Sequence, residues 1–188
     1  MKRRAALGLT GIVIAGGIGW NIRGDSHSVE LKDQSETPAR IPADIQAQMK
    51  NKQSTYSNPA TLEIRIHNQS DEDIVISAGK PAVFCYQISE PSNPGVILKP
   101  QKWEWLKHPV CVKSLRKQSI STELRTKQIK SGSAVVEEYA VWGQRSNDIM
   151  ECIPTGTFGF ESRYQLGIGV GNGGTDEEFD WGFSLKIS

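Results

Sequence analysis

The residue types best suited to chemistry are three histidines and three cysteines, and only one His–Cys pair is close in sequence. His108 and Cys111 are separated by two residues, a spacing that can supply half of a tetrahedral zinc site, with Cys85 or Cys152 as a third ligand. No matching second pair accompanies them, and a Cys–His nucleophile pair would also need a third residue to orient the base. We therefore expect no resident cofactor and no catalytic residues. A metal-dependent site at His108 and Cys111 is kept as an alternative.

A glycine-rich run near the C-terminus is followed by acidic residues. The glycines of 167–174 have spacings like those of a phosphate-binding loop, but strand patterns lie on both sides, where that loop requires a helix after it. We therefore expect a hairpin loop. Asp176, Glu178 and Asp180 are candidates for weak Ca²⁺ binding. Their spacing differs from that of an EF-hand, so a solvated acidic loop is the default interpretation.

Basic and aromatic residues are concentrated in the middle of the chain. Residues 102–130 include eight basic and two acidic side chains, whereas 137–188 include three basic and nine acidic ones. Trp103 and Trp105 would share one face of a strand, because alternate residues point the same way. With Lys107 and Lys113 they form a candidate surface for a cell-surface protein or an anionic polymer, but not for nucleic acid. The alternative is that both indoles point into the core and the charges are scattered.

Two features depend on the cellular compartment. In an exported protein, Cys85, Cys111 and Cys152 predict one disulfide and one remaining thiol, and the spacing leaves the pairing open. The alternative is that all three are small buried residues. Asn68 begins an N-glycosylation sequon in a predicted turn, so it is a candidate glycosylation site.

The N-terminus has the pattern of an export segment. Lys2, Arg3 and Arg4 precede the uncharged stretch Ala5–Trp20. Sixteen residues in a helix span roughly 24 Å, less than the roughly 30 Å hydrocarbon core of a bilayer. We interpret 1–24 as an apolar helix that is either a cleaved signal peptide or a retained signal-anchor. The rest of the chain is then extracytoplasmic, either membrane-anchored by the N-terminus or secreted.

The remaining sequence divides at about residue 60. Residues 25–59 are polar and poor in aromatic residues, which predicts a flexible linker, with a short helix possible over 43–50. From 60 to 188, apolar and polar residues alternate in several segments, including Leu62–His67 and Phe179–Ile187. We expect seven to nine short strands, no amphipathic helix, and an all-β sandwich or barrel. The predicted strands include 62–67, 74–76, 82–88, 96–98, 134–142, 157–164 and 179–187.

Three segments together resemble a known family. They are a strand running into a polar turn over Leu62–Asp73, a Pro-Thr-Gly-Thr-Phe element at Pro154–Phe158, and the closing Phe183–Ile187. The region 60–188 is similar to the immunoglobulin-like β-sandwich modules grouped around the BsuPI-type intracellular proteinase inhibitor. The resemblance implies an immunoglobulin-like antiparallel sandwich. The inhibitor itself is cytoplasmic, whereas this chain begins with an export segment.

These observations favour a non-enzymatic binding or structural module outside the cytoplasm. The second hypothesis is a protease-inhibitor-like module that acts through an exposed loop such as 167–178. Fold alone does not establish either function.

Overall fold

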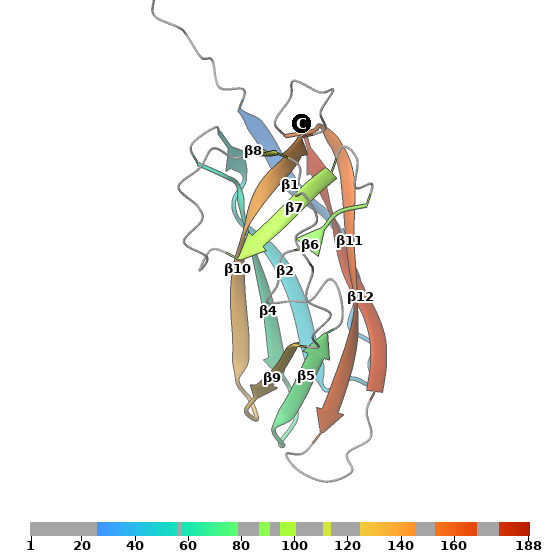
Figure 1. Cartoon of the computed structure of the whole chain (residues 1–188). Helices are drawn as coiled ribbons and strands as arrows, with labels where there is room; N and C mark the ends of the chain where they lie inside the picture. Colours follow the sequence, from blue (N-terminus) through green and yellow to red (C-terminus); the bar gives the residue numbers. More distant parts are fainter. Residues whose placement is uncertain are drawn as a thin grey trace, which may run out of the picture.

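The computed structural model describes residues 26–55, 58–78, 87–90, 95–100, 111–113, 125–145, 153–168 and 177–188 (Figure 1). Every regular element within these ranges is a β-strand. The described part of the chain contains no helix with the length and apolarity needed to span a bilayer. The predicted N-terminal helix over 1–24 lies outside these residues. The prediction of an all-β domain is confirmed.

Two sheets pack face to face. The first has the strand order β3 (Gln53–Ser54), β1 (His27–Gln34), β12 (Glu177–Ile187), β11 (Gly156–Ile168), β5 (Ile74–Ala78) and β9 (Arg125–Ile129). The second has the order β2 (Ala43–Asn51), β4 (Thr61–Asn68), β10 (Ala134–Arg145), β7 (Gly95–Pro100) and β6 (Gln87–Ile88). A short strand, β8 (Cys111–Lys113), pairs in parallel with β10, and the other pairings between the described strands are antiparallel.

The core lies between the sheets and is built from alternate residues of each strand. In β11 and β12 the inward positions carry large aromatic side chains. The rings of Phe160 and Phe183 stack with centroids 5.2 Å apart, and those of Tyr164 and Phe179 stack at 5.4 Å. Trp181 is 2 % exposed and meets the Tyr164 ring edge-on at 6.5 Å. Burial of these side chains supplies much of the hydrophobic stabilisation of the sandwich.

The predicted linker over 25–59 is wrong, because this interval contains β1, β2 and β3. Val29 of β1 is fully buried and pairs with Ile187 of β12, and Ile45 of β2 pairs with Ile66 of β4. The helix considered for 43–50 is also wrong, since these residues belong to β2. Helix formers such as Ala and Gln adopt the strand here because pairing with β4 overrides their weak intrinsic preference. The sandwich therefore includes 25–59 as far as these residues are described, from β1 onward.

The other predicted strands are confirmed where the structure describes them. The segments predicted at 62–67, 74–76 and 96–98 lie in β4, β5 and β7, and those at 134–142, 157–164 and 179–187 lie in β10, β11 and β12. Of the strand predicted over 82–88, only β6 falls within the described residues.

Candidate binding groove

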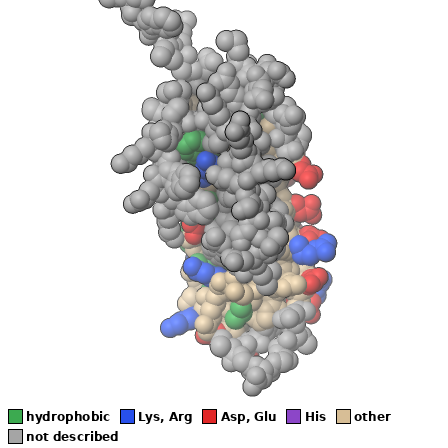
Figure 2. Space-filling view, in the orientation of Figure 1, with side chains coloured by type: hydrophobic (Ala, Val, Ile, Leu, Met, Phe, Trp, Pro, Cys, Tyr) green, Lys and Arg blue, Asp and Glu red, His purple; other side chains and the backbone are tan. Residues whose placement is uncertain are grey.

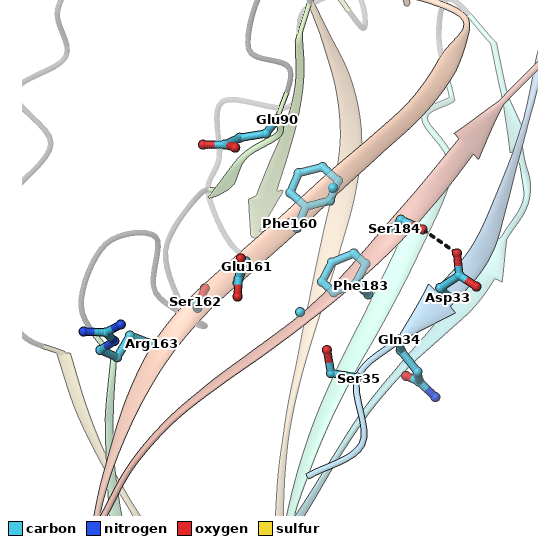
Figure 3. Close-up of a pocket in the computed structure, with 12 residues that line it drawn as sticks. Asp33, Gln34, Ser35, Glu90, Phe160, Glu161, Ser162, Arg163, Phe183 and Ser184 are labelled. Carbon is cyan, nitrogen blue, oxygen red and sulfur yellow. Dashed lines mark hydrogen bonds between the residues drawn. The ribbon is translucent and has the colours of Figure 1, made fainter. Parts of the chain in front are cut away.

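The outer face of β11 and β12 has a small excess of acidic side chains, with Glu161, Glu178 and Asp180 against Arg163 and Lys186. Figure 2 shows Asp and Glu side chains along the side of the molecule where β11 and β12 lie in Figure 1. A groove with a volume of about 630 Å³ opens in this region, next to the end of β1 (Figure 3). It is lined by residues 33–35, 90, 159–163 and 182–184.

Two glycines keep the sheet surface low in this groove. Gly159 pairs with Ser184, and Glu161 pairs with Gly182, so two outward-facing pairs each carry only one side chain. A Cβ on Gly182 would lie 2.5 Å from the carbonyl oxygen of Phe160, so no larger residue fits without a backbone shift. A Cβ on Gly159 would lie 3.7 Å from the carbonyl oxygen of Glu90, an ordinary contact. Close strand packing therefore requires glycine at Gly182.

Backbone hydrogen bonds fix the position of Glu90 beside β11. Its N–H donates to the carbonyl of Gly159 at 2.9 Å, and the Gly159 N–H donates back to the carbonyl of Glu90 at 2.9 Å. Glu90 follows β6 of the second sheet, so this bridge ties the two sheets together at one side. It places the Glu90 side chain on the wall of the groove (Figure 3).

The groove carries more negative than positive charge. Asp33, Glu90 and Glu161 contribute carboxylates, and Arg163 is its cationic lining residue. Arg163 Nε donates to Asp180 Oδ1 at 3.0 Å; this hydrogen bond and the Asp180 charge raise the pKa of the guanidinium. The Arg163 and Asp180 side chains are 68 % and 47 % exposed, so their pairing contributes little to stability but neutralises the cation. Asp33 accepts a hydrogen bond from Ser184 Oγ at 3.3 Å.

The carboxylates proposed for Ca²⁺ have protein partners in the described structure. Glu178 accepts a hydrogen bond from Gln165 Nε2 at 2.8 Å, and Asp180 pairs with Arg163. Both contacts cross from β12 to β11. The described residues contain no group of three or more metal-ligating side chains. Asp176 lies outside the described residues, so Ca²⁺ binding there stays a prediction.

Asn68, the predicted glycosylation site, is a structural residue of the folded domain. Its side chain is fully buried, and Nδ2 donates to the carbonyls of Glu72 at 2.8 Å and Ile129 at 3.1 Å. Oδ1 accepts hydrogen bonds from the Ser70 N–H at 2.9 Å and the Ser70 hydroxyl at 2.7 Å. Attachment of a glycan would replace one of the two Nδ2 hydrogens that Asn68 donates and would force its side chain out of the core. This packing therefore argues against glycosylation of Asn68.

Most other predicted site residues lie outside the described residues. This applies to Cys85, Cys152, Trp103, Trp105, Lys107 and His108. Cys111 and Lys113 belong to β8, opposite Gly143 and Arg145 of β10, but only their backbone is described. The disulfide, the zinc site and the tryptophan–lysine surface therefore stay predictions.

The sequence did not single out the residues that form the groove. Asp33 falls in the predicted linker over 25–59, and Glu90 and Glu161 are two charged residues among many. A usable signal is present in Phe158-Gly159-Phe160 and Trp181-Gly182-Phe183, where glycine takes the outward position between two buried aromatic residues. Glycine inside a strand marks a site where another group approaches closely.

Comparisons with protein-family models, curated proteins and solved structures find no match for this chain. The resemblance to the BsuPI-type group therefore stays a prediction.

Proposed function

We propose that this chain is a non-enzymatic binding module, built on an immunoglobulin-like sandwich and carried outside the cytoplasm by its N-terminal segment. The strand order supports the immunoglobulin-like assignment. The run β2-β4-β10-β7 corresponds to strands A, B, E and D of that fold, and β12-β11-β5 corresponds to G, F and C. In this assignment β1 is an added strand next to G, and β9 is an added strand next to C.

The observation that carries the binding function is the groove over Gly159 and Gly182. A concave surface with a few convergent polar groups is the usual form of a ligand site. Glu90 and Glu161 border it, and neither forms an ion pair within the described residues. Its charge favours a cationic partner and disfavours an anionic polymer at this position. We assign it to an extended segment of a surface protein that carries Lys or Arg side chains.

The export segment supports the location. The basic cluster before the uncharged stretch Ala5–Trp20 would keep the N-terminus cytoplasmic and place the sandwich on the far side. A retained segment would anchor the domain at the cell surface and a cleaved one would leave it secreted; in both cases the groove meets partners outside the cytoplasm. A fusion of the full chain to a reporter that is active only outside the cytoplasm tests this location, and an inactive but expressed fusion rejects it.

The binding proposal is tested with the full chain and two labelled peptides, one lysine-rich and one glutamate-rich. Fluorescence anisotropy should show binding of the lysine-rich peptide that weakens as salt is added. The variant Glu90→Gln/Glu161→Gln should bind it about tenfold more weakly, a loss of about 1.4 kcal/mol. Glu138→Gln, which changes an exposed carboxylate on β10 of the other sheet, is the matched control. Equal affinity of the double variant and the wild type would reject the groove as the site.

Protease inhibition is the second candidate, and the β11–β12 hairpin favours it. The two strands pair without interruption from Gly156 opposite Ile187 to Leu166 opposite Glu177, which would hold the connecting segment 169–176 on a rigid support. Residues 169–176 themselves lie outside the described structure. The full chain, assayed against serine and cysteine proteases, should inhibit at least one of them at stoichiometric concentration if this candidate is correct.

A further inference from the structure

β2 is the terminal strand of its sheet, and its outer edge is the side that faces away from β4. Among the described strands, β2 pairs only with β4. In an antiparallel pair, alternate residues direct their N–H and C=O groups to opposite sides of the strand. The amides of Ile45 and Ala47 point away from β4, because their hydrogen-bond partners lie on the other side. Such an edge is a template for an additional strand.

Two side chains occupy this edge. Gln34 Oε1 accepts a hydrogen bond from the Ala47 N–H at 2.8 Å, and Thr37 Oγ1 accepts one from the Ile45 N–H at 3.1 Å. Gln34 ends β1, which belongs to the opposite sheet, and Thr37 lies in the segment that joins β1 to β2. Two consecutive outward amides are therefore satisfied by side chains, where an added strand would otherwise supply carbonyls.

The sequence of β2 is complementary to itself about Ala47. If two copies paired antiparallel with Ala47 opposite Ala47, Ile45 would face Met49 on the inner side. On the outer side, Gln46 would face Gln48. Asp44 would face Lys50, which lies at the β-bulge between Met49 and Asn51 and forms an ion pair with Glu63 Oε2 at 3.2 Å. Ile45, Ala47 and Met49 would then be the residues that exchange hydrogen bonds, in agreement with the outward direction of the Ile45 and Ala47 amides. Opposite charges at facing positions stabilise such a pair.

We propose that Gln34 and Thr37 are edge-closing residues that keep β2 from pairing with β2 of a second copy of this chain. Their two hydrogen bonds make the edge unavailable, and their removal exposes a self-complementary strand. The resulting interface is isologous, so it closes as a dimer with twofold symmetry. This inference does not depend on the groove or on its partner.

The test uses the full chain, purified in one mild detergent, as wild type and as Gln34→Ala/Thr37→Val. Light scattering coupled to size exclusion, from micromolar to millimolar protein, should show one additional association step in the variant. The matched control is Gln34→Glu/Thr37→Ser, which retains both acceptor oxygens and should behave as the wild type. A folded Gln34→Ala/Thr37→Val variant with the association state of the wild type would overturn the proposal.

A charge change tests the register. Adding Asp44→Lys to the associating variant leaves the Lys50–Glu63 ion pair intact, places like charges opposite each other and should weaken the dimer about tenfold. Further addition of Lys50→Glu should restore it. A dimer insensitive to both changes would place the contact elsewhere and reject this interface. If the double variant does not fold, Gln34→Ala alone is compared with Gln34→Glu by hydrogen exchange at Ala47. Faster exchange only in Gln34→Ala supports the closing role, and equal exchange rejects it.

Discussion

The C-terminal hairpin and the N-terminal strands belong to the same sandwich but are stabilised differently. In β11 and β12 the inward positions carry Phe, Tyr, Trp and Leu, and the outward positions are joined by polar side-chain pairs. In β1 and β2 the inward positions are mostly Val, Ala and Ile, which bury far less area. The edge of β2 is satisfied by side chains from the neighbouring segment. A strand can therefore belong to a domain without carrying much of its hydrophobic core.

The two regions are joined by a few specific bonds. Trp181 Nε1 donates to the carbonyl of Ser35 at 2.9 Å, and the Ser35 N–H donates to the carbonyl of Gly182 at 2.8 Å. β1 pairs with β12 from Val29 opposite Ile187 to Gln34 opposite Phe183. The hairpin thus orders β1, whereas β2 is ordered by its pairing with β4.

The largest effect is expected from Trp181→Ala. Removal of a buried indole leaves a cavity beside Tyr164 and Phe183, which should lower the free energy of unfolding by about 3–5 kcal/mol. Urea unfolding followed by circular dichroism measures this loss. Trp181→Phe keeps much of the volume but removes the bond to Ser35, so it should cost less than the alanine variant. Equal losses in the two variants would show that the bond to the N-terminal segment matters more than the packing.

Ile45→Ala tests whether the N-terminal strands belong to the core. Ile45 is 2 % exposed and pairs with Ile66, so its truncation should lower the free energy of unfolding by about 2–3 kcal/mol. The same truncation in a flexible tether would have no effect. Gln48→Ala, at an exposed position of the same strand, is the control and should stay within about 0.5 kcal/mol of the wild type. A neutral result for Ile45→Ala in the same unfolding experiment would exclude β2 from the cooperative unit.

This contrast also explains which parts of the fold were predictable. Leu62–His67 and Phe179–Ile187 alternate large apolar and polar residues, and that pattern determines strand and inner face together. The segment 43–51 alternates as well, but with Ala at two of its inner positions, and Ala and Gln favour helix when considered locally. Its strand conformation is imposed by tertiary contacts, namely the pairing with β4 and the hydrogen bonds to the Gln34 and Thr37 side chains.

The groove was less predictable than the strands. It depends on which outward residues of β11 and β12 face each other, and that register is set by pairing across the hairpin. Glu90 reaches the groove from β6 of the other sheet, through a bridge to Gly159. No local pattern in the sequence carries that information.

The smallest expected effect concerns pH and should be confined to the hairpin core. Tyr164 is 1 % exposed, and burial raises the pKa of its hydroxyl above the ordinary value of about 10, while the Ser162 side chain acts in the opposite direction. Below about pH 10 both the folded and unfolded chains hold this proton, so its contribution to stability is fully present. Above that pH the unfolded chain releases the proton more readily, and stability falls by about 1.4 kcal/mol per pH unit.

Tyr164→Phe isolates this contribution, because lysines and other groups titrate equally in both proteins. Urea unfolding near neutral pH should give similar stabilities, and the Phe variant should become the more stable of the two as pH rises above about 10. Gln34 and Thr37 do not titrate, so Gln34→Ala/Thr37→Val should show the same alkaline loss as the wild type. If the stabilities of wild type and Tyr164→Phe fall in parallel as pH rises, the Tyr164 hydroxyl loses its proton as readily in the folded chain as in the unfolded one. The folded core would then not shield this hydroxyl from solvent.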